Sequence, residues 1–106
     1  MKKIQKNIFE ILFLHPKPVK MLTSLKMDDV RYATQVSKAV DCTYSHTVKV
    51  LEMFRRLGLV QFEKKGRIKI VKLTDNGVDI AHDFEGLRRK FNKLGGQIKE
   101  IPMEKA

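Results

Sequence analysis

Apolar residues recur at every third or fourth position over much of the chain, the spacing that places side chains on one face of a helix. In residues 2–15 this face is opposed by lysines and Glu10, so we expect an amphipathic first helix there. Its apolar side chains are those of Ile4, Ile8, Ile11 and Leu12.

Two prolines follow this helix and should end it, because proline lacks an amide hydrogen and restricts the residue before it. Pro18 suits the first turn of a short second helix, which we expect over residues 19–26. An acidic connector should follow around Asp28 and Asp29, and residues 30–32 after it fit a short strand.

A helix, a tight turn and a longer helix are expected next. Thr34 and Thr43 suit the starts of the two helices, because their hydroxyl oxygens accept hydrogen bonds from free backbone amides. Asp41 and Cys42 occupy the turn, and Gly58 should end the longer helix in the left-handed conformation. The expected inward-facing residues are Val36, Ala39 and Val40 in the shorter helix and Thr47, Leu51, Phe54 and Leu57 in the longer one.

Alternation of apolar and polar residues then predicts two strands, residues 60–63 and 67–73. Lys64, Lys65 and Gly66 would form the tip of this hairpin, since glycine permits a positive φ. On this prediction one face of the hairpin carries Val60, Phe62, Ile68 and Ile70.

A last helix is expected from Asp75 to Leu94, ending at Gly95 and Gly96. Its apolar residues follow a near-heptad with Gly77 at one place, a pattern typical of a helix that packs along another at a small crossing angle. The repeat comprises Leu73, Ile80, Phe84, Leu87, Phe91, Leu94 and Ile98.

Charge and cysteine content narrow the class of protein. The 106 residues suffice for one domain with a modest core, and 22 Lys+Arg against 12 Asp+Glu give a formal charge of +10. Such an excess favours a polyanionic partner because phosphate contacts release counterions, although a solubilising surface is the alternative.

Cys42 is the only cysteine, which excludes an intrachain disulfide and favours a reducing, cytoplasmic compartment. No apolar run approaches the roughly 20 residues that span a bilayer, so no membrane association is expected.

The order of these elements is that of a winged helix-turn-helix, a mainly α fold with a small β-wing. Its motifs resemble those of the winged-helix transcription regulators, in particular the MarR-like and ArsR-like groups and their small archaeal relatives. The resemblance extends from Thr34 to Asp83. The matching motifs are LEMFRRLGLVQFE at 51–63, the wing KKGRIKIV at 64–71 and LTDNG at 73–77.

The resemblance implies a homodimer that reads a pseudo-palindromic operator in double-stranded DNA, with half-sites about 34 Å apart. The chain then divides into an N-terminal dimerisation helix (1–17), a DNA-binding domain (18–74), a C-terminal dimerisation helix (75–98) and a flexible tail (99–106). The apolar stripes independently favour a dimer because they exceed what so small a core can cover; packing of the terminal helices on each other within one chain is the alternative. The expected dimer contacts are Ile4, Ile8, Ile11, Leu12, Ile80, Phe84, Leu87, Phe91 and Leu94.

In this fold the helix over residues 43–57 enters the major groove, and the hairpin over residues 61–73 lies on the flanking groove or its phosphates. The base-edge candidates are Tyr44, Ser45, His46, Val48 and Lys49. Phosphate contacts near helix starts are expected from Gln35, Ser37, Lys38 and Thr43, and those of the wing from Lys64, Lys65, Arg67 and Lys69. Each is alternatively a solvated surface residue, but neighbouring cations on a hairpin repel each other without an anionic partner.

Metal and enzyme functions are disfavoured by the residue patterns. Cys42 and His46 are four positions apart, but a pair falls short of the three or four ligands that zinc takes, and His15 or His82 would have to join them through tertiary structure. The chain has no glycine-rich phosphate loop, nucleophile elbow or paired carboxylates in an apolar setting. We therefore expect no metal, no cofactor and no catalytic activity.

The leading hypothesis is a sequence-specific transcription regulator, acting as a repressor by occupying its operator. An adaptor that binds proteins within transcription or replication machinery is the second, and a nonspecific architectural DNA binder is the third. Preference for one DNA sequence separates the first from the third. Dependence of DNA binding on the wing cations separates the first from the second. The operator, the target genes and any small-molecule effector lie beyond the sequence.

Overall fold

The computed structural model describes residues 7–27 and 32–95. The fold is mainly helical with one two-stranded antiparallel sheet, which confirms the predicted fold class. None of the helices in these residues is long and apolar enough to cross a membrane. The elements are α1 (Ile8–Phe13), α2 (Pro16–Met27), α3 (Ala33–Ala39), α4 (Tyr44–Arg56), β1 (Val60–Lys65), β2 (Ile68–Leu73) and α5 (Asp75–Lys93).

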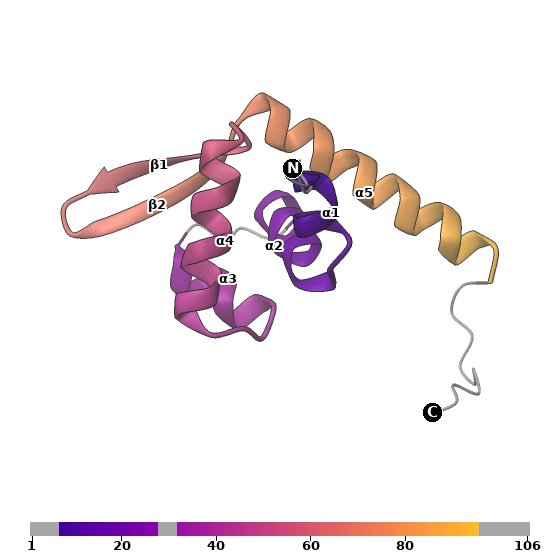
Figure 1. Ribbon diagram of the computed structural model, residues 1–106, viewed down its shortest axis with the longest axis horizontal. Helices are drawn as coiled ribbons and strands as arrows, with labels where there is room; N and C mark the ends of the chain where they lie inside the picture. The colour runs from indigo at the N-terminus through magenta and orange to yellow at the C-terminus, as the bar shows by residue number, and fades with distance from the viewer. Residues whose placement is uncertain (1–6, 28–31, 96–106) are drawn as a thin grey trace, which may run out of the picture.

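Helices α1 to α4 gather into one body, from which the hairpin and α5 extend in different directions (Figure 1). Aromatic rings hold the centre of this body together. The centre of the Phe13 ring lies 5.9 Å from the centre of the Phe54 ring and 5.2 Å from that of the Phe84 ring. Helices α1, α4 and α5 therefore meet at one point. The largest fully buried side chains are those of Phe54, Leu12, Met21, Leu22, Leu51 and Val36.

The first two helices differ from their predicted bounds. Asn7 caps α1, which ends at Phe13 rather than at residue 15. Helix α2 begins at Pro16 instead of residue 19, so the prolines start the second helix as well as ending the first. The first turn of a helix tolerates proline because the amides there have no partner within the helix.

The cap of helix α3 lies two residues earlier than predicted, because Thr34 is not the cap. Tyr32 stands at the cap position, and its backbone amide donates to Oε1 of Gln35 at 2.9 Å. Tyr32 also forms an isolated antiparallel bridge to Ile70 of the hairpin. The rest of the expected strand at residues 30–32 lies outside the described residues.

Two residues predicted to face the core are exposed. Ala39 ends α3 on its outer side, and Val40 after it turns inward. Leu57 is 42% exposed, because it caps α4 just before the chain reverses at Gly58. Val50 is buried in its place, so the inward face of α4 is formed by Thr47, Val50, Leu51 and Phe54.

The hairpin has a different register from the predicted one. Lys65 pairs with Ile68, so the turn consists of Gly66 and Arg67, and Lys64 and Lys65 belong to β1. This register pairs even-numbered residues of β1 with odd-numbered residues of β2, and paired residues point to the same face. Val71 and Leu73 therefore share a face with Val60 and Phe62. Ile68 and Ile70 lie on the opposite face.

The turn between α3 and α4 is held from outside by Lys17. Asp41 has a positive φ of 58°, an uncommon conformation for a residue with a side chain. The Lys17 ammonium donates to the carbonyl oxygen of Val40 at 2.9 Å and to that of Asp41. A cation at the carboxyl end of a helix also interacts favourably with the helix dipole. Lys17 thus ties α2 to the turn that orients α4.

A second junction joins α4, the hairpin and α5. Gly58 has a φ of 80°, and its carbonyl oxygen accepts a hydrogen bond from the Thr74 hydroxyl at 2.6 Å. The Thr74 amide donates to the carbonyl of Leu59 at 3.0 Å, and the Thr74 hydroxyl oxygen accepts from the Gly77 amide at 3.1 Å. A Cβ on Gly77 would stand 2.0 Å from the oxygen of Leu59. The LTDNG motif therefore encodes a helix cap and a close approach between backbones.

Gly77→Ala is expected to destabilise the protein by about 3 kcal/mol, because the added methyl group overlaps the Leu59 carbonyl and forces the start of α5 outward. Urea denaturation measures the change. Gly86→Ala is the matched control in the same helix, since its Cβ would meet only the end of the Arg89 side chain at 3.9 Å. The control should gain about 0.5 to 1 kcal/mol from helix propensity. Equal effects of the two substitutions would contradict the close contact.

Lys17→Met should loosen the turn before α4 and lower stability by about 1 kcal/mol, through loss of its hydrogen bonds to Val40 and Asp41. Amide hydrogen exchange provides the readout, because the Cys42 amide, which donates to Ser37 at 2.9 Å, should lose protection. Lys20→Met, at an exposed position of the same helix, is the control. Unchanged exchange at Cys42 in the Lys17 variant would show that Lys17 does not hold the turn.

Candidate nucleic-acid interface

Helix α4 is anchored by its buried face and by a capped first turn. The Thr43 hydroxyl oxygen accepts from the His46 amide at 3.2 Å, as the sequence predicted. The Thr47 hydroxyl donates to the Thr43 carbonyl at 2.8 Å, which satisfies a polar group in the core. The opposite side of the first two turns is exposed, and it carries Tyr44, Ser45, His46, Val48 and Lys49. The structure therefore places these base-edge candidates together at the accessible start of one helix.

Of the candidates near helix α3, Lys38 is exposed and Ser37 is not. The Ser37 side chain is 9% exposed, and its hydroxyl donates to the carbonyl of Thr34 at 3.0 Å. The Ser37 hydroxyl is therefore turned into its own helix and already uses its hydrogen there, unlike the exposed side chain of Lys38. Gln35 uses its side-chain oxygen to cap α3, and Thr43 uses its hydroxyl to cap α4. Both are exposed, but these oxygens already have a structural role.

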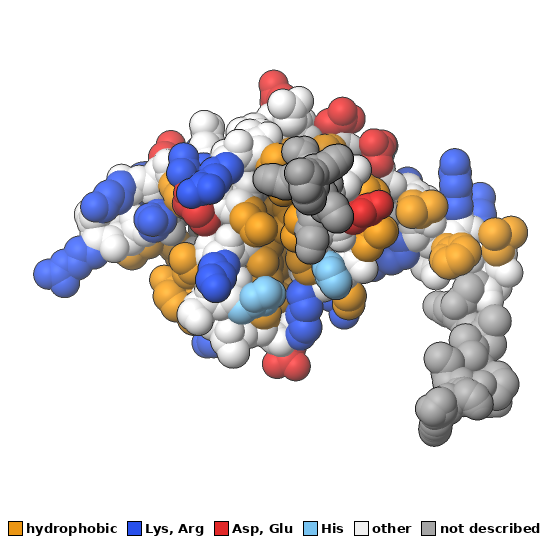
Figure 2. Space-filling model, in the orientation of Figure 1, with side chains coloured by type: hydrophobic (Ala, Val, Ile, Leu, Met, Phe, Trp, Pro, Cys, Tyr) orange, Lys and Arg blue, Asp and Glu red, His pale blue; other side chains and the backbone are white. Residues whose placement is uncertain are grey.

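The hairpin presents its cations on both of its faces. Lys64 and Lys69 are paired across the strands, Lys65 lies on the opposite face, and Arg67 occupies the turn. The Lys69 ammonium stands 4.9 Å from the centre of the Phe62 ring, a cation–π contact that holds the long side chain along the strand. All four of these side chains are exposed. Figure 2 shows Lys and Arg side chains along the hairpin and at its end.

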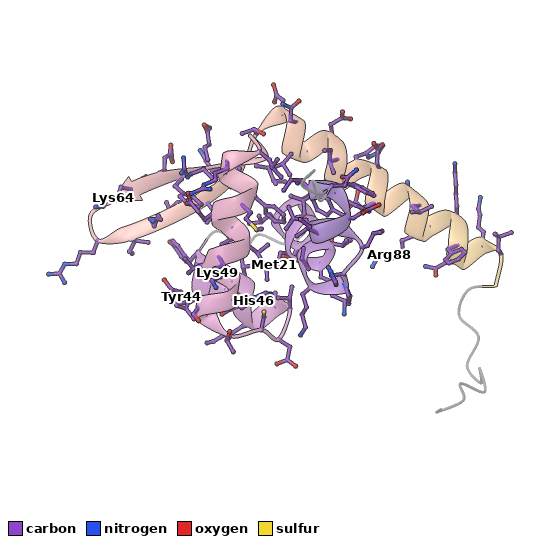
Figure 3. All side chains as sticks on the ribbon, in the orientation of Figure 1. Met21, Tyr44, His46, Lys49, Lys64 and Arg88 are labelled. Atoms are coloured by element: carbon purple, nitrogen blue, oxygen red, sulfur yellow. The ribbon has the colours of Figure 1, made fainter. Side chains whose placement is uncertain are left out.

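Helix α4 and the hairpin border a common cleft of about 500 Å³. Its floor is apolar and includes Leu51 and Val71, while Tyr44, Arg67 and Lys69 line it with polar atoms. Figure 3 shows Tyr44, His46 and Lys49 on α4, with Lys64 on the neighbouring hairpin. Of the candidates, Tyr44 and Val48 of the helix and Arg67 and Lys69 of the wing thus line the same cleft.

The far end of α4 carries an ionic cluster that was not predicted from the sequence, although the spacing of its charged residues would have indicated it. Glu52 accepts hydrogen bonds from the guanidinium of Arg55, and a nitrogen of Arg56 lies 3.6 Å from it. The hydrogen bond from Arg55 lowers the pKa of the Glu52 carboxyl, and the same bond raises the pKa of Arg55. The spacing of three and four residues is that of ion pairs on a helix surface. The carboxylate offsets these arginines, so they contribute less to an anion-binding surface than their number suggests.

The candidate dimer contacts fall into buried and exposed groups. Leu12 is 2% exposed and packs in the core of the single chain. Ile4 lies outside the described residues, Ile8 is exposed and Ile11 is half-buried. In α5 the exposure rises along the helix, from the half-buried Ile80 and Phe84 to the exposed Leu87, Phe91 and Leu94.

A second cavity, of about 420 Å³, lies between the α1–α2 turn and α5, and Phe13, Val19, Phe84 and Arg88 are among its lining residues. Within residues 7–27 and 32–95, no group of His, Cys, Asp and Glu is arranged to hold a metal ion. Cys42 is half-buried beside the core.

Comparison with known proteins identifies the fold. No protein-family model matches the chain. Over 64 residues it is 31% identical to an uncharacterized protein of Archaeoglobus fulgidus, a match that spans 60% of this chain and 66% of the relative, just under two thirds.

Solved structures extend the comparison over most of the chain. The AF1382 protein of Archaeoglobus fulgidus superposes with a TM-score of 0.65 at 26% identity, over 80% of this chain and 97% of that one. A variant of MepR from Staphylococcus aureus, bound to an oligodeoxyribonucleotide, gives 0.66 at 20% identity, over 87% of this chain and 71% of that one. A MarR family transcriptional regulator from Silicibacter pomeroyi gives 0.66 at 21% identity, over 80% and 59%. The chain therefore has the winged helix-turn-helix fold of the MarR-type transcription regulators.

Proposed function

We propose that this protein is a sequence-specific transcription regulator that binds double-stranded DNA as a homodimer and represses by occupying its operator. One observation carries the proposal. The exposed start of α4 and the cationic hairpin border the same cleft, so a duplex can meet both at once. In this fold the helix enters the major groove and the wing lies against the flanking groove or its phosphates.

The contacts divide by chemistry into base-reading and phosphate-binding groups. Tyr44, Ser45, His46 and Lys49 can donate hydrogen bonds to base edges from the first two turns of α4. The hairpin cations Lys64, Lys65, Arg67 and Lys69 take phosphate contacts, with Lys38 on α3 as a further cation. The formal charge of +10 supplies the long-range attraction to a polyanion. The MepR variant of the same fold was solved with an oligodeoxyribonucleotide, which supports DNA as the ligand.

The homodimer part of the proposal rests on the terminal helices. Ile8 of α1 and Leu87, Phe91 and Leu94 of α5 expose large apolar side chains that a second copy would cover. A twofold dimer of this fold reads two half-sites about 34 Å apart on one side of the duplex.

Replacing Lys64, Lys65 and Arg67 together by alanine should weaken binding to every duplex sequence and flatten the dependence of log K on log salt by up to about three units, one for each phosphate that the wing no longer neutralises. Fluorescence anisotropy across a salt series measures the slope. Lys20, Arg89 and Lys93 replaced together are the matched control, since they remove equal charge from α2 and α5. If both variants flatten the slope equally, the wing has no special place in the complex.

Ser45→Ala or His46→Ala should cost about 1 to 3 kcal/mol on the preferred operator and little on unrelated DNA, because base-edge contacts act only on the matching sequence. Competition binding with operator and scrambled duplexes gives both values. Arg56→Ala, at the far end of the same helix, is the control. Equal weakening on both duplexes would mean that these side chains contact the backbone only.

The deciding experiment compares binding to a labelled pool of random duplexes with binding to the DNA upstream of the protein's own gene. Salt-resistant preference for the upstream DNA would support a regulator that reads its own operator. Equal and steeply salt-dependent binding would instead indicate an architectural binder or an operator elsewhere. Absence of binding at low salt would indicate a protein-binding adaptor.

A further inference from the structure

Val48 is a base-edge candidate whose side chain cannot form a hydrogen bond. It is 39% exposed, on the solvent side of α4 and not on the buried side formed by Thr47, Val50, Leu51 and Phe54. The core therefore does not require an apolar residue at this position. A single exposed valine is common on protein surfaces, so the surroundings of Val48 decide whether it has a ligand.

Val48 belongs to an apolar strip on the wing side of α4. Tyr44 lies one helical turn before it and is 56% exposed, and residues four positions apart are neighbours on a helix surface. Both side chains line the cleft between α4 and the hairpin, where Leu51 and Val71 continue the apolar surface. In Figure 3, Tyr44 and His46 lie on opposite sides of the start of α4, and Tyr44 is on the side of the hairpin. The exposed apolar surface is thus continuous and larger than one side chain.

Cations border this strip and indicate the class of ligand. Arg67 and Lys69 line the same cleft, and Lys49 is exposed on the helix beside the strip. Glu52 also lines the cleft, but its carboxylate accepts a hydrogen bond from Arg55. A surface that places cations around an apolar strip suits a polyanion that also carries an apolar group.

In the major groove of duplex DNA, thymine carries such a group. The edges of guanine, adenine and cytosine present hydrogen-bond donors and acceptors, whereas thymine adds its C5 methyl group. Contact between an apolar side chain and that methyl group removes both from water, which is favourable. Against cytosine, the same side chain would displace water from the N4 amino group without offering it a partner, which is costly. A valine at this place therefore distinguishes thymine from cytosine.

We infer that Val48 is a specificity-determining residue that reads the methyl group of a thymine in each half-site of the operator. Ser45 lies three positions before Val48 and is exposed on the same face of α4. Hydrogen bonds to base edges and the methyl contact then come from the same two turns of the helix. The inference rests on the proposed function and names a base that the bound sequence must contain.

Deoxyuridine tests the methyl contact, because it pairs as thymine does and lacks only the C5 methyl group. The operator is first obtained by in vitro selection from a random duplex pool with the wild-type protein. Each thymine is then replaced in turn by deoxyuridine, in both half-sites together. Replacement of the thymine that Val48 reads should weaken binding by about fourfold per half-site, the loss expected for one buried methyl group, and roughly fifteenfold in a symmetric operator.

Val48→Ala shows whether Val48 makes this contact. The variant should bind the thymine operator more weakly and should lose most of the deoxyuridine penalty at that position, because the two changes remove opposite sides of one contact. Val78→Ala is the matched control, because Val78 is 41% exposed and lies in the first turn of α5, outside the residues that line the cleft. The control should leave the operator affinity and the penalty unchanged. Circular dichroism of both variants checks that they are folded.

Three outcomes would overturn the inference. If no replaced thymine weakens binding, the strip is covered by something other than a base, such as a protein or a small amphipathic anion. If the penalty persists in Val48→Ala, another side chain, such as that of Ile68 in the wing, contacts the methyl group. In both cases a preferred sequence has been found, so sequence-specific binding stands. A selection that yields no preferred sequence would instead overturn the proposed function, and the inference would fail with it.

Discussion

The close approach of Gly77 to the carbonyl of Leu59 is the contact on which the arrangement of the other elements depends. It lets the start of α5 sit directly on the chain as it leaves α4, at a distance that no side chain would permit. Thr74 reinforces the contact by bonding to the backbone of both segments and by capping α5. Because the hairpin begins and ends at this junction, the direction of the wing and the direction of α5 are set together.

Helix α4 is buried on one side only, and its other side faces solvent. Phe54 and Leu51 fix one side of the helix in the core, and Lys17 holds the turn in front of it. In its first two turns the opposite side is exposed, so its polar and aromatic side chains are available to a ligand. Further along α4, Glu52 forms ion pairs with Arg55 and Arg56. The unbalanced positive charge near this surface therefore comes mainly from the hairpin. Shape and charge therefore point to the same partner.

Helix α5 differs from the other helices because only its first half belongs to the core of the single chain. Phe84 contacts Phe13, and Glu85 forms an ion pair with Lys26 at 3.1 Å, which docks this half on α1 and α2. Beyond Leu87 the apolar residues continue along an exposed part of the helix, where the charged side chains are basic instead of acidic. The exposed half of α5 is therefore the part of the helix that a second copy would cover in the proposed homodimer.

The order of elements, the caps at Thr43 and Thr74 and the glycine stops follow from local chemistry, and the sequence alone determined them. Each depends on a few neighbouring residues whose backbone preferences are strong. The sequence did not determine the strand register of the wing. A two-residue turn at Gly66 and Arg67 reverses which face of β2 is apolar, and only the pairing across the strands reveals this turn. The burial of Leu12 and Ser37 within the single chain has a related reason: helical spacing shows that a face exists, but not which neighbour covers it. Tertiary structure decided that, because burial depends on residues far apart in the chain that come together only in the fold.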